Sequence, residues 1–271
     1  MGKVWLIASG KGGVGKSTAA SALGVALARL NQRVCVVDAD IGLRDLDALL
    51  GVEDRVVYDL LDVANRGCSL EKALLPLPGT PGLCLLPASQ FARAKELSPK
   101  AFSKVASALR ERFDHVLVDC PAGAERGLRG LLTCEPEAVV LVCTPDDVCI
   151  RDADRIASLM KKKGLPTPQL LVNRLAIELI ERGEMCTAPV VAQTLELPLL
   201  GEIPEDISVY RAVLNHLPLM DIDCEAEEAF QRIARRMLGE AVPPANLGVK
   251  KRSWLRRMLG DTYKDVKLLD R

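Results

Sequence analysis

The stretch Gly10-Lys11-Gly12-Gly13-Val14-Gly15-Lys16-Ser17-Thr18 lies between an apolar run, Val4–Ala8, and a helical pattern, Ser17–Leu30. It fits G-x-x-x-x-G-K-[ST] in the strand–loop–helix context that this pattern requires. Glycines let backbone amides converge on phosphate oxygens, and the helix amino terminus adds partial positive charge. Every residue from Lys11 to Thr18 is therefore a candidate nucleotide-binding residue. Lys16 is expected to reach the β- and γ-phosphates, and Ser17 to bind Mg²⁺.

Apolar runs alternate with helical patterns along the rest of the chain. The runs are nearly continuous, as expected for parallel strands covered on both faces. The expected strands are Val4–Ala8, Arg33–Val37, Gly82–Leu86, His115–Val118, Ala138–Cys143, Gln169–Val172 and Leu199–Ile203. The expected helices are Ser17–Leu30, Pro99–Arg112, Arg151–Lys163, Thr187–Leu195 and Glu225–Leu238. This alternation predicts one α/β P-loop NTPase domain over residues 1–242, with a mostly parallel central sheet between two helical layers.

The composition narrows the class of protein further. Lys plus Arg and Asp plus Glu both number 36 in the 271 residues, so no global charge favours nucleic acid. The nine cysteines form no C-x-x-C pair, which indicates reduced thiols in a cytosolic protein and disfavours an iron–sulfur site. No run of 18 apolar residues is present, so the sequence predicts no membrane-spanning segment.

Three aspartates follow apolar runs, at the places where strands of such a sheet end. Asp38 and Asp40 close the second expected strand, and Asp119 heads the turn after His115–Val118. Asp119 and Asp38 are candidate Mg²⁺ ligands, and Asp40 is a candidate for orienting the attacking water. Each could instead cap a turn, but the loop at Gly10–Thr18 favours the site interpretation.

Catalysis of triphosphate hydrolysis would rest on positioning and on neutralising phosphate charge. Lys16 and Asp40 are the expected catalytic residues, together with Lys11. Lys11 stands early in the loop and could reach a partner's phosphates across a dimer interface. Hydrolysis would then require dimerisation.

The C-terminus departs from the α/β pattern. Residues 243–249 contain Pro243-Pro244 and are expected to form a linker. Residues 250–260 are expected to form a basic amphipathic helix, which suits an anionic membrane surface. Its cations are Lys250, Lys251, Arg252, Arg256 and Arg257, and its apolar stripe is Trp254, Leu255, Met258 and Leu259. The alternatives are a helix docked on its own domain and a nucleic-acid contact, and residues 261–271 form a further tail.

The run from Lys11 to Thr18 resembles the deviant Walker A motif of the MinD/ParA family of ATPases. Other segments resemble, in the same order, the branch of that family that places the bacterial division septum. They are Asp38–Asp47, Val56–Asp59, Leu86–Gln90, Asp119–Gly123, Val148–Arg155, Asn173–Arg174 and Gly201–Asp206. Cys120 stands where a small hydroxyl residue is common, and the tail past Gly260 is longer than in many relatives.

The resemblance implies an ATP- and Mg²⁺-dependent switch. Asn173, Arg174, Pro204, Glu205 and Asp206 match positions around adenine, and Arg151, Asp152 and Asp154 match part of a regulator-binding surface. ATP would drive homodimerisation, and paired C-terminal helices would hold the protein peripherally on the inner face of the cell membrane. The dimer would recruit a MinC-like division inhibitor, and a MinE-like activator or another topological factor would act on it.

Three other functions compete with this one. A ParA-like DNA-segregation ATPase would bind DNA in ATP with strong salt dependence, which the balanced charge disfavours. A flagellar-number regulator also uses a terminal amphipathic helix. A metal-cluster carrier ATPase would need paired cysteines, which the sequence lacks.

Overall fold

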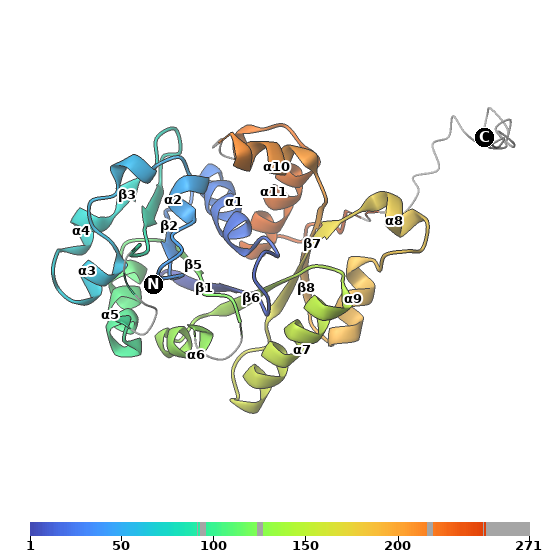
Figure 1. Ribbon diagram of the computed structural model, residues 1–271, viewed down its shortest axis with the longest axis horizontal. Coiled ribbons are helices and arrows are strands. Elements are labelled where there is room, and N and C mark those ends of the chain that lie inside the picture. The colour runs from blue at the N-terminus through green and yellow to red at the C-terminus, as the bar shows by residue number, and fades with distance from the viewer. Residues whose placement is uncertain (91, 93–95, 124–126, 216–218, 246, 248–271) are drawn as a thin grey trace, which may run out of the picture.

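The computed structural model describes residues 1–90, 92, 96–123, 127–215, 219–245 and 247. Its centre is a sheet in the order β3-β4-β2-β5-β1-β6-β7-β8 (Figure 1). The strands are β1 Lys3–Ala8, β2 Val34–Asp38, β3 Leu75–Pro76, β4 Leu83–Leu86, β5 His115–Asp119, β6 Ala138–Cys143, β7 Gln169–Leu175 and β8 Leu199–Pro204. All neighbouring pairs are parallel except β3 with β4.

Helices cover both faces of this sheet, as Figure 1 shows. One layer holds α1, α10 and α11, and the other holds α5, α6, α7 and α9. The helices are α1 Lys16–Arg29, α2 Leu46–Leu49, α3 Leu60–Ala64, α4 Leu70–Ala73, α5 Pro99–Arg110, α6 Gly127–Leu131, α7 Asp147–Lys162, α8 Ile177–Glu181, α9 Ala188–Leu195, α10 Ile207–Leu214 and α11 Glu225–Met237. The predicted fold, an α/β domain with a mostly parallel sheet between helical layers, is confirmed.

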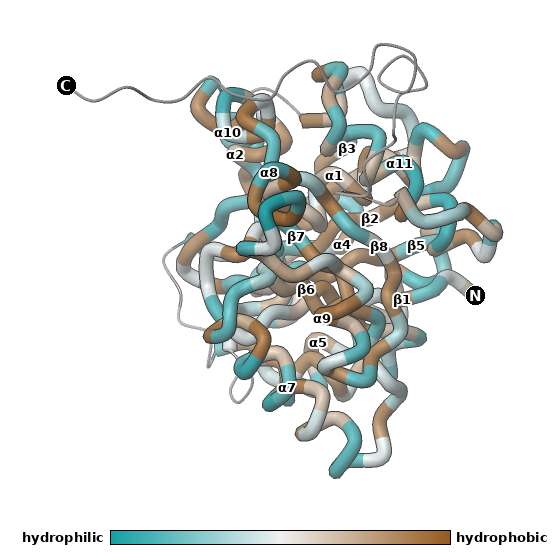
Figure 2. The backbone as a smooth tube through the Cα atoms, turned by 90° about the vertical axis from the view of Figure 1, so that its right-hand side faces the viewer, coloured by the Kyte–Doolittle hydropathy of each residue, from teal (hydrophilic) through white to brown (hydrophobic). Residues whose placement is uncertain are grey.

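The central strands are buried along their whole length because both sheet faces are covered. Every residue of β2, β5 and β6 is buried, and the tube in Figure 2 is largely brown along the central strands. Close packing requires glycine at Gly24 of α1, where an added Cβ would lie 2.4 Å from Val36 Cγ2. The core therefore fixes α1, and with it the loop that precedes it, against β2.

The boundaries differ from the predicted ones in a few places. Helix α7 begins at Asp147 rather than Arg151, because the Asp146 side chain accepts a hydrogen bond from the Cys149 amide at 3.0 Å and caps it. The short edge strand β3 and the helices α2, α3, α4, α6, α8 and α10 were not predicted. No helix among the described residues is long and apolar enough to cross a membrane.

Candidate nucleotide site

Glycine geometry and one side chain fix the backbone conformation of the loop between β1 and α1. Gly13 and Gly15 have φ of +78° and +91°, values that side-chain-bearing residues rarely adopt. The Asn173 side-chain amide, from β7, donates to the Val14 carbonyl at 2.8 Å. A Cβ on Gly15 would lie 2.3 Å from that amide nitrogen. Asn173 thus supports the loop, and its place beside adenine stays a prediction.

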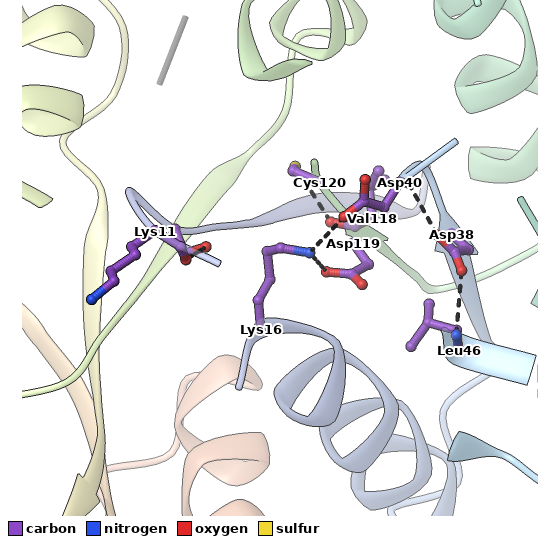
Figure 3. Close-up of polar contacts among 9 residues, drawn as sticks. Lys11, Lys16, Asp38, Asp40, Leu46, Val118, Asp119 and Cys120 are labelled. Carbon is purple, nitrogen blue, oxygen red and sulfur yellow. Dashed lines mark hydrogen bonds and ion pairs between the residues drawn. The ribbon is translucent and has the colours of Figure 1, made fainter. Parts of the chain in front are cut away.

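The side chain of Lys16 lies at the centre of the site (Figure 3). Its Nζ is 2.6 Å from Asp119 Oδ1 and 3.9 Å from Asp40 Oδ2. Burial alone would lower the pKa of Lys16, but the Asp119 carboxylate outweighs it, and this pKa lies above its usual value. Lys16 is therefore a charged donor at the mouth of the loop.

The predicted aspartates meet at the carboxyl edge because β2 and β5 pair in register, Asp38 opposite Asp119. Asp38 accepts backbone hydrogen bonds from Asp40 at 3.0 Å and Leu46 at 3.3 Å, which pins the segment between them. Burial, and then the nearby Asp119 charge, raise the pKa of Asp38 to about 7. Asp38 thus acts as a buried tether in this structure, and Asp40 is the partly buried member that lines the cavity.

A cavity of about 430 Å³ opens beside the loop. Its lining combines polar loop groups, including Ser9, Lys16, Ser17 and Thr18, with Asp40 and Asp45. It is also lined by the apolar residues Leu43, Ala48, Leu49, Ala212 and Val213. A cavity lined by both polar loop groups and apolar side chains suits a molecule that carries phosphates and a flat ring.

The site has features that fit Mg²⁺ bound together with phosphate. Asp119 Oδ2 is buried and has no hydrogen-bond partner within the described part of the chain. Burial raises the pKa of Asp119, and Lys16 opposes that shift. The described residues contain no group of three or more His, Cys, Asp or Glu side chains that could hold a metal alone. Mg²⁺ characteristically takes one or two carboxylates and completes its shell with water and substrate phosphates, so these residues fit it.

Lys11 is not part of this cluster. Its side chain is exposed and points away from Lys16 (Figure 3). Against the effect of burial, hydrogen bonds from Thr144 and Cys149 hold the pKa of Asp146, the cap of α7, below its usual value, and the Lys11 charge makes a smaller contribution in the same direction. Lys11 therefore lies on the α7 side of the loop, away from the site around Lys16 of the same chain.

The predicted regulator surface lies on α7, next to the loop. Arg151 and Asp154 are exposed, and Asp152 pairs with Arg155 at 3.1 Å. A Cβ on Gly10 would lie 2.5 Å from Asp152 Cβ, so the start of the loop rests directly on α7. This close approach connects the loop to the predicted surface.

Not every predicted residue lies in the cavity wall. Arg174 lines it, whereas Pro204, Glu205 and Asp206 do not. Asp206 instead caps α10 by accepting from the Ser208 amide at 2.8 Å. Ala212 and Val213, which α10 brings to the cavity wall, were not predicted from the sequence. Asp206 as a helix cap was the signal that could have revealed this helix. The predicted membrane residues and the tail lie outside the described residues.

A glycine loop at the carboxyl edge of a parallel sheet, with strand-ending aspartates around its lysine, defines a P-loop nucleotide-binding protein. Residues 5–219 match the CobQ/CobB/MinD/ParA nucleotide binding domain family. The septum site-determining protein MinD of Bacillus subtilis is 40% identical over 246 residues, 90% of this chain and 91% of that protein. The chain therefore belongs to the MinD/ParA family of nucleotide-binding ATPases, and within it to the MinD group.

Solved structures support the same grouping. A MinC:MinD cell division protein complex from Aquifex aeolicus has a TM-score of 0.80 and 34% identity, covering 89% of this chain and 97% of that one. MinD of Pyrococcus horikoshii complexed with Mg-ADP has a TM-score of 0.77 and 29% identity, covering 88% of this chain and 96% of that one. The neighbours thus include a nucleotide complex and a complex with a second division protein.

Proposed function

We propose that this chain is a Mg²⁺-dependent ATPase that switches between cytoplasm and membrane and helps to place the division septum. The single observation that carries this proposal is the Lys16–Asp119 pair beside the glycine loop, in a chain of the MinD group. Lys16 exchanges Asp119 for the β- and γ-phosphates when the nucleotide enters. The Asp119 carboxylate, relieved of Lys16, then becomes available to Mg²⁺ together with Ser17 and Asp38.

Hydrolysis needs a positioned water and neutralised phosphate charge. Mg²⁺, when bound, withdraws charge from the phosphate oxygens. Asp40 is partly exposed at the cavity and orients the water, while Asp38 holds the Asp40 amide in place. A strong base is unnecessary, because a loose phosphoryl transition state asks little of one. Asn173 and Arg174 support the nucleotide side of the cavity.

Dimerisation completes the site in this proposal. The outward direction of Lys11 (Figure 3) supports a role across a two-fold interface, where each chain's Lys11 reaches its partner's phosphates. The dimer also doubles the copies of residues 250–260, and two weak membrane contacts on one particle bind far more tightly than one. ATP binding would thereby control membrane binding.

The division role is inferred from the relatives. The MinC:MinD complex supports a MinC-like inhibitor as partner, and Arg151, Asp152 and Asp154 on α7 are the proposed contact. A MinE-like activator or another topological factor would act on the same helix and promote release. The proposed organisation is an ATPase domain over 1–242, a linker over 243–249, a membrane helix over 250–260 and a tail over 261–271.

Co-sedimentation with anionic lipid vesicles tests this proposal, in Mg·ATP and in Mg·ADP, with duplex DNA as the parallel arm at the same salt. We expect vesicle binding in ATP only, no DNA binding, and faster phosphate release when vesicles are present. Trp254→Glu should abolish vesicle binding and leave ATP binding unchanged. DNA binding in ATP without vesicle binding would contradict the proposal and indicate a segregation ATPase.

A further inference from the structure

Asp45 is a second carboxylate in the wall of the nucleotide cavity, besides Asp40. It stands at the amino-terminal cap position of α2, yet its side chain caps no backbone amide there. The side chain is exposed, and within the described part of the chain it makes no hydrogen bond or ion pair. The negative charge of Asp45 is therefore available to act on a molecule that enters the cavity.

The backbone on both sides of Asp45 is held in place. Before it, Arg44 has a φ of +54°, a left-handed conformation that a residue with a side chain adopts only when its surroundings enforce it. The Arg44 guanidinium donates to the buried Asp47 carboxylate at 2.5 Å, which supplies that restraint. After it, the Leu46 amide donates to the Asp38 carboxylate at 3.3 Å (Figure 3). Asp45 is thus kept at the cavity by its two neighbours in the chain.

The charge of Asp45 reaches the centre of the site. Burial is the largest cause that raises the pKa of Asp40 and that of Asp119, and the Asp45 charge adds to the rise in both. Among the described residues that line the cavity, Lys16 and Arg174 are the cations, and Lys16 is already paired with Asp119. Phosphate groups that enter without a cation therefore meet negative charge that is only partly compensated.

A divalent cation changes the sign of this interaction. Mg²⁺ cancels part of the phosphate charge and keeps several of its waters, and a carboxylate can accept hydrogen bonds from such waters. We propose that Asp45 makes the site select nucleotide that carries a divalent cation, because its carboxylate repels metal-free phosphates and attracts the hydrated cation. The proposal rests on the proposed function, in which Mg²⁺ and the nucleotide occupy this cavity together. Asp45 is then a specificity-determining residue that acts on binding.

A purely structural role for Asp45 predicts a different result. If Asp45 only started α2 or shaped the loop, its replacement would weaken the binding of metal-free and metal-loaded nucleotide alike. Asparagine and serine serve at cap positions about as well as aspartate, so Asp45→Asn and Asp45→Ser remove the charge and retain a residue suited to that position. The two roles are therefore separated by whether these variants change the preference for the metal-loaded form.

Calorimetric titration of the full chain with ADP, once in excess Mg²⁺ and once in EDTA, measures this preference. The quantity compared is the Kd in EDTA divided by the Kd in Mg²⁺. We expect this ratio to be roughly tenfold smaller in Asp45→Asn than in the wild type, because metal-free ADP binds more tightly and Mg·ADP more weakly. The matched control is Asp54→Asn, which removes the same charge at an exposed residue outside the cavity lining and should keep the wild-type ratio.

The ratio decides the matter. A smaller ratio in Asp45→Asn and Asp45→Ser, but not in Asp54→Asn, supports the proposal. A wild-type ratio in both Asp45 variants, at an unchanged unfolding temperature, overturns it. Equal weakening of both forms of ADP also overturns it, because Asp45 would then only shape the loop. If the wild type itself bound no Mg·ADP, the proposed function would fail as well, so its failure is distinguishable from failure of the role given to Asp45.

Discussion

The two ends of strand β5 carry the same pair of charges in opposite settings. At the amino end, Asp114 pairs with Arg33 at 2.7 Å in the open, and that hydrogen bonding lowers the pKa of Asp114 to about 2. At the carboxyl end, Asp119 pairs with Lys16 at 2.6 Å, yet burial raises the pKa of Asp119. The first pair, Arg33 and Asp114, has its hydrogen bonds satisfied at the surface. The second leaves one carboxylate oxygen without a partner in the described chain, which is the condition for taking a ligand.

The surroundings extend this contrast. Beside the amino end, the Trp5 indole donates to His115 Nδ1 at 3.2 Å and the rings stack. Beside the carboxyl end, the backbone is held in left-handed conformations at Gly13 and Gly15. Buried parallel strands alone do not make a site. The site arises where the sequence leaves charge buried and incompletely paired at one edge.

The largest difference between the two ends of β5 should appear when the cation of each ion pair is removed. Lys16→Met should lower the free energy of unfolding of the nucleotide-free protein by about 3 kcal/mol, because it leaves Asp119 buried without a partner. Arg33→Met should cost much less, since solvent screens the exposed pair. Denaturant unfolding measures both. Adding Asp119→Asn to Lys16→Met should recover most of the lost free energy of unfolding. Equal losses for Lys16→Met and Arg33→Met would contradict the difference between the two ends of β5.

A second difference concerns the two glycines of the loop. Gly15→Ala should destabilise by at least about 2 kcal/mol, because φ is positive and the new Cβ meets the Asn173 amide. Gly13→Ala has the same sign of φ but no heavy atom within 4 Å of its added Cβ, so only about 1 kcal/mol is expected. Thermal unfolding without nucleotide compares them. If Gly13→Ala lowers the stability as much as Gly15→Ala does, contact with the Asn173 amide is not the cause of the Gly15→Ala loss.

The smallest expected effect is a pH dependence at the amino edge. Burial lowers the pKa of His115, so the folded protein favours neutral imidazole. The unfolded chain then binds more protons between the folded pKa and about 6.5, so stability is complete above that range and falls as the pH drops through it. The slope should reach at most about 1.4 kcal/mol per pH unit. His115→Gln should flatten the difference between unfolding at pH 7.5 and pH 5.5, and an unchanged slope would assign it to other groups.

Much of the site could be predicted because its parts are local in sequence. The positions of the strands are enough to bring the loop motif together with the strand-ending Asp40 and Asp119. Asp38 was harder, since its hydrogen bonds to Asp40 and Leu46 depend on the path of the following loop. Ala212 and Val213 could not be predicted from composition, because the phase of a short, apolar helix decides which side faces the cavity.

Calorimetric titration of the nucleotide-free protein with Mg·ADP tests the central claim most directly, that Lys16 leaves Asp119 to bind phosphate. We expect one site in the wild type and affinity at least about 100-fold weaker in Lys16→Met, as for a lost charge-assisted contact in a buried site. Equal affinity in the two proteins would contradict it and place the nucleotide elsewhere.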